Sequence, residues 1–497
     1  MVRYLLAWAG GTIILSLAFK GADRATRPRG PFSGGTIGTR QIAPWYGRVV
    51  VFIVCLLVAV TAARGTLRQG PPLRWGDVYT TDSNFANQLG LNGTLSLVAA
   101  AKSRMSEDRD NIWKATLEQP LAQQTVRDML VMPDDKLVDT ATAAVRRDYT
   151  PPADKTLPIK NVVVILMESM AGHSVGALGA PGNITPYLDK LSKEGLLFDR
   201  FFSNGTHTHQ GMFATMACFP NLPGFEYLMQ TPEGSHKLSG LPQLLSARDY
   251  DDVYVYNGDF AWDNQSGFFS SQGMTTFIGR NDFVNPVFSD PTWGVSDQDM
   301  FDRGLIELKA REKRQAVLCL AANLVQPHPL CAADAVAGRA GHRPWQPERT
   351  PDCHALLRLG AGPVLREGPQ GALLQGNPVR RGRRPWLWQR TPDHRDGPGP
   401  FQRTDAVDRS GRPGKKFGQR NHTVGTQVDI VPTIMGRIGG QVRNQCWGRD
   451  LLNLPQGDPG FGVIKPSGSD QTTAIIRGDT VLMLPKEKGN GAEDVSL

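Results

Sequence analysis

The chain has 497 residues, of which 40% are hydrophobic, and a formal net charge of +8. This length accommodates one large catalytic domain with additional segments, and the apolar content is sufficient for its core. The positive charge is not gathered into a basic patch with interleaved aromatic residues, so the composition argues against a nucleic-acid-binding protein.

Two apolar runs near the N-terminus, residues 4–19 and 49–63, predict membrane helices. Each is slightly shorter than the roughly 20 residues that span a bilayer. Arg3 before the first run also suits a signal peptide, but no clean small-residue cleavage site follows. We therefore expect residues 1–65 to form a membrane anchor with two transmembrane helices.

The segment between these runs is strongly basic and contains a single acid, Asp23. Its basic residues are Lys20, Arg24, Arg27, Arg29, Arg40 and Arg48. The positive-inside rule therefore places this segment in the cytoplasm and everything after residue 63 outside it. Arg64, Arg68 and Arg74 weaken the contrast.

The six cysteines show no paired spacing and no Cys-x-x-Cys sequence, and Cys55 lies in the second apolar run. This pattern predicts neither a disulfide framework nor a zinc site.

Residues 66–158 are mixed in character, and we interpret them as a connector. From residue 159 onward, strand and helix patterns alternate. The runs "NVVVILM" and "DDVYVYNG" are typical of buried strands. Thr185 and Pro186 are expected to begin one helix, and Gly439 to end another. This alternation predicts an α/β domain at residues 159–485, with a mainly parallel sheet flanked by helices.

Glu168 directly follows the first of these strands. Ligands of open α/β sheets bind outside the carboxyl ends of the strands, so this carboxylate is expected to face a crevice. An ordinary strand-end acid that caps a helix would have the same position. The sequence around Glu168 alone leaves both interpretations open.

The stretch "SNGTHTHQGMFATMACF" places Thr206, His207, Thr208 and His209 near the start of an expected helix. Exposed amides and the helix dipole favour anions at such a position. A threonine hydroxyl becomes a nucleophile only when a base or a metal activates it. A carboxylate and a threonine together would suit a divalent cation, whereas simple N-capping is the alternative.

Residues 161–211 closely resemble the lipoteichoic acid synthase-like sulfatases, which are phosphoglycerol transferases of the alkaline phosphatase superfamily. The resemblance follows the pattern "VILMES…TPxLDKLxKEGLxFxxFxSNGTxTxxG". It extends to "GPPLRWGDVYTTDSNFANQLGLNG", "QVDIVPTIMGRIGG" and "WGRDLLNLP". It implies an alkaline phosphatase/sulfatase-like fold, a bacterial plasma-membrane location and an extracytoplasmic catalytic domain. The family usually has more membrane helices than two, which leaves open whether an upstream portion is missing.

The resemblance also implies roles for individual residues. Glu168 would be a metal ligand, and Thr208 would be both nucleophile and metal ligand. Thr206 fits the family pattern less well. Trp262 resembles a substrate-contacting position. The implied cofactor is Mn²⁺ or Mg²⁺, the donor is a phosphatidylglycerol-type phospholipid, and the acceptor is a glycan or polymer hydroxyl.

The family completes its metal site with a late Asp-His pair, and no "DHG" sequence occurs in this chain. Arg384, Pro385 and Trp386 stand in its place. Arginine cannot ligate a cation because it has no free lone pair. The pair Asp393 and His394 is a weak substitute, since its surroundings contain no strand pattern.

Residues from about 311 to 413 are rich in Arg, Pro, Gly and Ala, and read literally they form a basic disordered linker. We interpret them instead as translated one base out of frame. Read one base later, codons that encode "RQAVLC" can encode "GKPFFA". At the same offset, codons for "VQPHPL" can encode "SNHTPY", and codons for "VRRGRRPW" can encode "FVVVADHG". These sequences are typical of the family and occur in the right order. The chain as written would then be inactive or misfolded, and its sheet would lack central strands.

Several other functions remain open at this point. A hydrolase of sulfuric or phosphoric esters could share the fold, although sulfatases use a modified Cys or Ser and Thr208 argues against one. A phosphoethanolamine transferase also uses threonine. If the missing Asp-His pair is real, a non-catalytic membrane-anchored protein is the alternative from another class.

Overall fold

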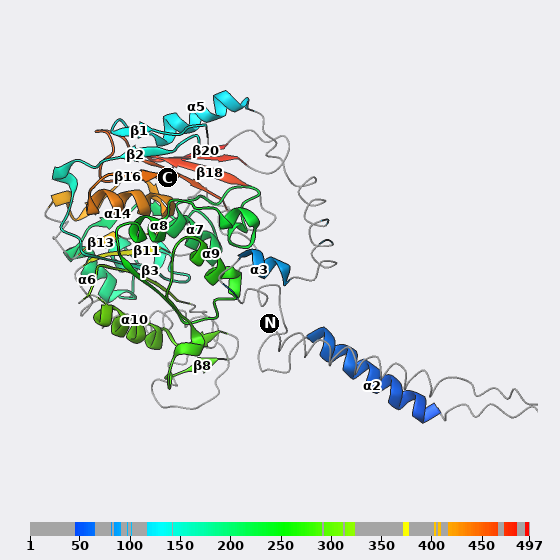
Figure 1. Ribbon diagram of the computed structural model, residues 1–497. Coiled ribbons are helices and arrows are strands. Elements are labelled where there is room, and N and C mark those ends of the chain that lie inside the picture. The colour runs from blue at the N-terminus through cyan, green and yellow to red at the C-terminus, as the bar shows by residue number, and fades with distance from the viewer. Residues whose placement is uncertain are drawn as a thin grey trace, which may run out of the picture. The chain divides into compact units, whose positions relative to one another are not determined.

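The computed structural model separates the chain into two compact units, Met1–Arg68 and Gln69–Leu497. The structure describes residues 45–64, 84–90, 117–323, 371–376, 402–403, 406–408, 416–465, 472–484 and 493–496, with gaps at 142, 291–292 and 312–313, and the single positions 81, 97 and 101. In the first unit the described residues form helix α2 (Trp45–Arg64), which contains the second apolar run (Figure 1). The first run lies outside the described residues. No helix in the described part of the chain combines the length and apolar character needed to cross a membrane.

A mainly parallel sheet forms the centre of the second unit, in the strand order β13-β11-β3-β10-β6-β7. Its strands are β3 (Asn161–Leu166), β6 (Asp251–Tyr256), β7 (Phe277–Ile278), β10 (Val317–Ala322), β11 (Gly371–Gly376) and β13 (Ala406–Asp408). Every neighbouring pair is parallel except β11 and β13. The predicted α/β fold with a mainly parallel sheet is therefore confirmed.

Strand β3 shows why this sheet needs cover on both faces. Its six residues are all buried, as expected for a strand in the middle of a parallel sheet. Val162 and Val164 pack with α7 (Thr208–Ala217), α8 (Leu241–Ser246) and α14 (Ile430–Ile438). Val163 and Ile165 pack with α6 (Pro186–Glu194) and α10 (Asp297–Arg311) on the opposite face. The result is a three-layer arrangement, with the sheet between the two sets of helices (Figure 1).

Strand β10 corrects one expectation about the Arg-rich tract. The sheet was expected to lack central strands there, yet β10 lies between β3 and β6 and its six residues are buried. Leu320, for example, pairs with Val164 and Tyr254. The run "VLCLAA" is apolar enough to form a buried strand, whatever the composition of the residues that follow.

The local signals at two helix ends are also confirmed. Thr185 is the N-cap residue of α6, and its hydroxyl donates to Asp189 Oδ1 over 2.9 Å. Gly439 ends α14 with φ of 85°, a conformation that glycine adopts without steric cost.

Part of the region interpreted as a connector folds with the second unit. It contributes α5 (Gln119–Leu130), β1 (Asp135–Leu137) and β2 (Arg147–Tyr149). Strand β2 pairs with β1 and with β16 (Val442–Asn444), which follows α14 in the chain. A buried ion pair of 3.1 Å between Arg147 and Asp135 supports this small sheet.

The remaining elements are short. They are α3 (Asn84–Leu89), α9 (Gln265–Ser271), β4 (Leu197–Phe198), β5 (Phe201–Phe202), β8 (Ser289–Asp290), β9 (Gly294–Val295), β12 (Gln402–Arg403), β14 (Arg420–Asn421), β15 (Gly425–Thr426), β17 (Phe461–Ile464), β18 (Thr473–Arg477), β19 (Thr480–Leu484) and β20 (Glu493–Ser496). Strands β17 to β20 form an antiparallel sheet of their own.

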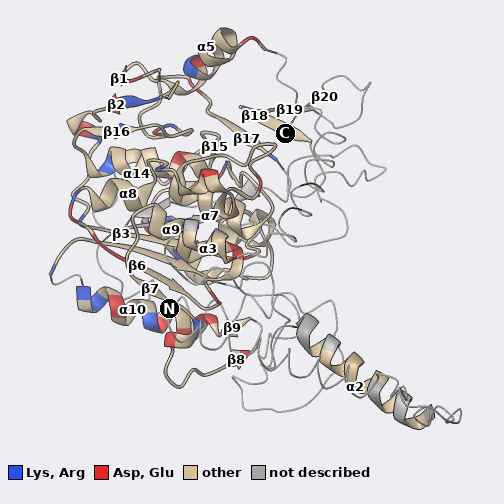
Figure 2. Cartoon of the chain, turned by 45° about the vertical axis from the view of Figure 1, so that its right-hand side comes forward, with Lys and Arg blue, Asp and Glu red and all other residues tan. Residues whose placement is uncertain are grey.

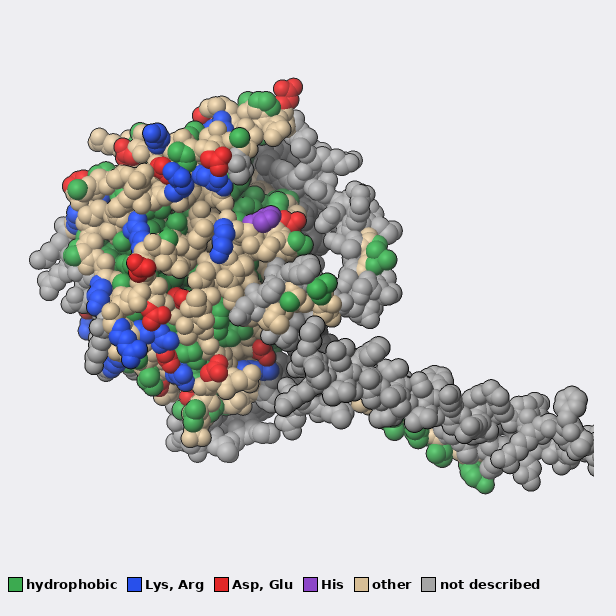
Figure 3. All heavy atoms as spheres, viewed as in Figure 1, with side chains coloured by type: hydrophobic (Ala, Val, Ile, Leu, Met, Phe, Trp, Pro, Cys, Tyr) green, Lys and Arg blue, Asp and Glu red, His purple; other side chains and the backbone are tan. Residues whose placement is uncertain are grey.

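Charges of both signs share the described surface. Acidic residues occupy the first turn of α10 and basic residues its last turn, an order that complements the helix dipole and is visible in Figure 2. The face seen in Figure 3 likewise carries Lys and Arg side chains interspersed with Asp and Glu.

Candidate active site

Glu168 lies two residues beyond the last residue of β3, at the carboxyl edge of the sheet. Its backbone N–H donates a hydrogen bond of 2.6 Å to Asn323 Oδ1. Asn323 directly follows β10, the neighbouring strand. The position of Glu168 is therefore fixed by two adjacent strand ends, and its side chain is half-buried.

Thr208 is the first residue of α7, after His207 as N-cap residue. The side-chain oxygen of Gln210 accepts from the backbone N–H groups of Thr206 and His207 over 3.0 and 3.1 Å. This hydrogen bonding shapes the turn before the helix and leaves the Thr208 hydroxyl directed toward the sheet. There it donates to Glu168 Oε2 over 2.9 Å.

Glu168 and Thr208 were both candidate site residues in the sequence. They are 40 positions apart in the chain, and the structure brings them into contact. The Thr208 hydroxyl contacts Glu168, and the backbone N–H of Thr206 contacts Gln210. The helix N-terminus adds a partial positive charge at Thr208, which favours an anionic group there.

A buried amide–carboxylate network supports this edge of the sheet, and no local sequence pattern predicts it. Asp297 accepts hydrogen bonds of 2.8 Å from Asn257, which follows β6, and of 2.8 Å from Asn323. Because Asn323 in turn accepts from Glu168, Asp297 links three strand ends. Burial raises the pKa of Asp297 to about 7, and the two amide donors only partly oppose this shift.

The donor set at Glu168 and Thr208 agrees in kind with Mn²⁺ or Mg²⁺, since both cations prefer oxygen ligands. It is incomplete, however: within the described ranges no three His, Cys, Asp or Glu side chains come together in a way that could hold a metal ion. Asp393 and His394, and Arg384 to Trp386 at the expected position of the family pair, lie outside the described residues.

Trp262 lies near this site in a short 3₁₀ helix, Trp262–Asn264, and is 36% exposed. Its neighbour Asp263 contacts His209, the residue after Thr208, with 3.2 Å between Asp263 Oδ2 and His209 Nδ1. The substrate-contacting position inferred from the sequence is therefore connected to α7 through Asp263. The His209–Asp263 pair was not foreseen, because nothing in either local sequence indicates the other.

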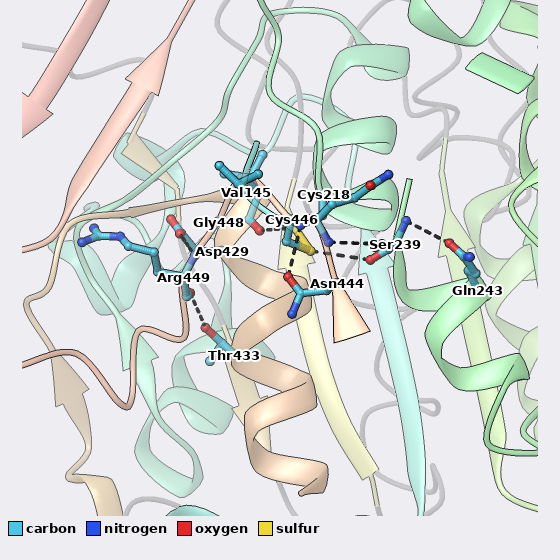
Figure 4. The surroundings of a disulfide bond; sticks show 12 residues. Val145, Cys218, Ser239, Gln243, Asp429, Thr433, Asn444, Cys446, Gly448 and Arg449 are labelled. Carbon is cyan, nitrogen blue, oxygen red and sulfur yellow. Dashed lines mark hydrogen bonds between the residues drawn. A yellow bond between two sulfur atoms is a disulfide. The ribbon is translucent and has the colours of Figure 1, made fainter. Parts of the chain in front are cut away.

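The expectation of no disulfide is wrong for one pair, Cys218 and Cys446 (Figure 4). Cys218 directly follows α7, and Cys446 follows β16, 228 residues later. Sequence spacing could not reveal a pair so far apart. The bond links the C-terminal end of α7, which is the end opposite Thr208, to the residues after β16. The Cys446 backbone N–H donates a hydrogen bond of 3.2 Å to Asn444 Oδ1.

Residues 160–352 match the family model described as Sulfatase. The chain therefore contains a sulfatase-type domain with the alkaline phosphatase/sulfatase-like α/β fold, as the resemblance at residues 161–211 implied.

The individual relatives agree with this class. The chain is 20% identical to the lipoteichoic acid synthase-like protein YvgJ of Bacillus subtilis over 169 residues, which are 33% of this chain and 27% of that protein. A solved protein of the alkaline phosphatase superfamily from Vibrio parahaemolyticus is 18% identical, with a TM-score of 0.61, covering 76% of this chain and 88% of that one. The lipoteichoic acid synthase LtaP from Listeria monocytogenes is 15% identical, with a TM-score of 0.54, covering 75% and 90%. The match to YvgJ thus spans about a quarter of that relative's length.

Proposed function

We propose that this protein is a membrane-bound phosphoglycerol transferase-like enzyme of the bacterial plasma membrane, with its catalytic domain on the extracytoplasmic side. It would move glycerophosphate from phosphatidylglycerol to a hydroxyl group of a glycan or polymer. The observation that carries this proposal is the 2.9 Å contact between the Thr208 hydroxyl and Glu168, made at a strand end and a helix N-terminus.

Thr208 acts as the nucleophile in this proposal. Its Oγ1 forms a bond to the donor phosphorus, the bond from phosphorus to the diacylglycerol oxygen breaks, and the hydroxyl proton passes to diacylglycerol. An acceptor hydroxyl then attacks the phospho-threonine, and its proton returns to Thr208. The N-terminus of α7 stabilises the phosphoryl group through its amides and dipole.

Glu168 and Thr208 would hold Mn²⁺ or Mg²⁺, and the cation would lower the pKa of the threonine hydroxyl and balance the phosphoryl charge. Glu168 already accepts the hydrogen bond from Thr208, so it orients the oxygen that attacks. The two residues alone form an incomplete set of ligands, and the remaining ligands must come from elsewhere in the protein.

We further propose that the missing ligands are encoded in the alternative reading frame of residues 311–413. In that frame the codons of "VRRGRRPW" can specify an Asp-His pair after a strand-like run. Resequencing the gene across the codons for residues 300–425 tests this idea directly. A missing or extra base near each end is expected, whereas an unchanged sequence would contradict the proposal and leave a chain without this chemistry.

The extracytoplasmic location has support from the disulfide. Bonds such as that between Cys218 and Cys446 persist in oxidising compartments and are rare in the cytosol. The membrane attachment rests on the two apolar runs and on the basic segment between them. Fractionation of cells into membrane and soluble parts, with and without residues 1–65, would test it.

The reaction is tested with phosphatidylglycerol vesicles and Mn²⁺, using the chain as written and the chain with the reading frame restored. We expect diacylglycerol release only from the restored protein. Release of inorganic sulfate from an aryl sulfate would instead identify a sulfatase, and release of diacylglycerol from phosphatidylethanolamine a phosphoethanolamine transferase. No turnover by either form would favour a non-catalytic membrane-anchored protein.

A further inference from the structure

An apolar loop, residues 283–288 with the sequence FVNPVF, follows β7 at the sheet edge of the candidate active site. Strand β7 is parallel to β6, and β6 and β3 are both parallel to β10, so their carboxyl ends meet at one edge. Before the loop, the N–H of Arg280 donates to the carbonyl oxygen of Gly258 over 3.0 Å. After it, the N–H of Val295 donates to the carbonyl oxygen of Asn257 over 2.9 Å. The loop is therefore anchored just beyond the end of β6, and it projects beside α10 (Figures 1 and 2).

Two valines of the apolar loop extend into solvent. Val284 is 84% exposed and Val287 is 64% exposed. Phe283 is partly buried and packs against the core on the α10 face of the sheet. Phe283 thus anchors the loop from within, whereas the two valines form its outer surface.

Helix α10 keeps the loop in this conformation. Its Asp299 accepts a hydrogen bond of 2.9 Å from the backbone N–H of Val287, and its Arg303 donates one of 2.9 Å to the carbonyl oxygen of Asp282. The Asp282 side chain in turn accepts from the N–H of Gly279 over 2.8 Å. With its backbone held at these points, the loop presents its valines at the surface.

The charge and the size of this surface favour a lipid bilayer as its partner. Residues 281–302 contain no Lys or Arg, so attraction to phosphate groups does not supply the binding force. Two valines expose far less than the roughly 800 Å² that each partner buries in a stable protein complex. Shallow insertion into a bilayer needs no complementary protein surface, because its free energy comes from the burial of apolar side chains.

We propose that Val284 and Val287 insert into the surface of the membrane and hold the candidate active site at the level of the lipid headgroups. The inference rests on the proposed function, in which the donor is a membrane phospholipid. Because the apolar loop and Glu168 lie at the same edge of the sheet, insertion of the loop turns this edge toward the lipid. This role differs from attachment, which the proposed function assigns to residues 1–65.

A nitroxide spin label at position 284 measures the insertion. The full chain with Val284→Cys and Cys55→Ser, which removes the free exposed cysteine, is mixed with vesicles of phosphatidylcholine and phosphatidylglycerol and recovered by flotation. Leu121→Cys in the same background is the matched control, because Leu121 is 55% exposed on α5, at the other end of the second unit from β8 (Figures 1 and 2). Relative to an aqueous nickel complex, lipid-soluble oxygen should reach the label at 284 several-fold better than the label at 121. This difference should persist at high salt, since it does not depend on charge.

Val287→Cys repeats the measurement if a label at position 284 disturbs the fold. Equal accessibility at the loop and at the control position, or failure of the chain to float with the vesicles, would overturn the inference. Spectral broadening between labels on two copies would overturn it too, because a second copy would then cover the loop. Insertion without release of diacylglycerol would contradict only the proposed function, and release with both loop labels in water would contradict only the insertion.

Discussion

Thr208 Oγ1 donates a hydrogen bond to Glu168 Oε2 across 2.9 Å. This contact joins the N-terminus of α7 to the carboxyl end of β3, two positions that α/β proteins commonly use for ligands. The proposed chemistry depends on this contact more than on any other contact of the site.

Replacement of Thr208 by alanine removes the attacking oxygen. In the protein with the restored reading frame, we expect diacylglycerol release to fall by roughly a thousandfold or more, as is usual for loss of a nucleophile. Thr206→Ala is the matched control, because this substitution keeps the backbone N–H that donates a hydrogen bond to Gln210. If Thr206→Ala lost most of its activity while Thr208→Ala stayed active, Thr206 and not Thr208 would be the nucleophile.

Glu168→Gln tests the metal site without relying on turnover. A ligand that binds only the folded state raises its melting temperature, so Mn²⁺ should stabilise the restored protein. We expect Glu168→Gln to lose most of this shift, because an amide is a weaker ligand than a carboxylate. Glu194→Gln at the exposed end of α6 should keep the full shift. Equal shifts in both variants would remove Glu168 from the site.

The disulfide between Cys218 and Cys446 closes a loop of 228 residues. Changing both cysteines to serine should therefore lower the free energy of unfolding by about 2–5 kcal/mol, measured in urea. Cys55→Ser is the control, since that cysteine is free and exposed. Peptide mapping without reductant should recover the linked pair, and its absence from protein purified under oxidising conditions would argue against the bond.

Asp297 should make stability depend on pH. Its pKa in the folded state is about 7, above the ordinary value of 3.8, so the folded state holds this proton more tightly than the unfolded state. The stability that the protonated Asp297 carboxyl contributes is fully present below pH 3.8 and is lost as the pH rises through about 7.

We therefore expect Asp297→Asn, which cannot ionise, to gain stability relative to the unchanged chain as the pH rises from 4 to 8. The measurement is the difference in melting temperature between the two proteins across this range. Burial also raises the pKa of Asp429, to about 6, but this contribution is common to both proteins and cancels. Asn257 Oδ1 is buried without a hydrogen-bond partner among the described residues, so it can turn to accept from the new amide. A difference that does not change with pH would contradict the account of Asp297.

Local sequence signals predicted the fold well, because β3, β6, α6 and α14 each have an apolar pattern or a terminating residue of their own. The family resemblance also selected Glu168 and Thr208, which the structure brings into contact. Contacts between distant segments were not foreseen. Neither the His209–Asp263 pair nor the Cys218–Cys446 bond leaves a local pattern, since each depends on how the sheet and helices pack.

Strand β10 illustrates a different limit. Composition marked the whole tract from about residue 311 as foreign to an α/β domain, yet Val317–Ala322 is a buried central strand. Average composition over about a hundred residues conceals a short apolar run. A six-residue strand needs only such a run and neighbours that complete its hydrogen bonds.

Mass spectrometry of the Thr208 peptide is the most direct test of the central claim. The protein with the restored frame is incubated with phosphatidylglycerol and Mn²⁺ and then quenched before an acceptor is added. The account predicts one glycerophosphoryl group on Thr208, absent from the Glu168→Gln variant and from the chain as written. Diacylglycerol release with no modification, or with the group on another residue, would contradict it.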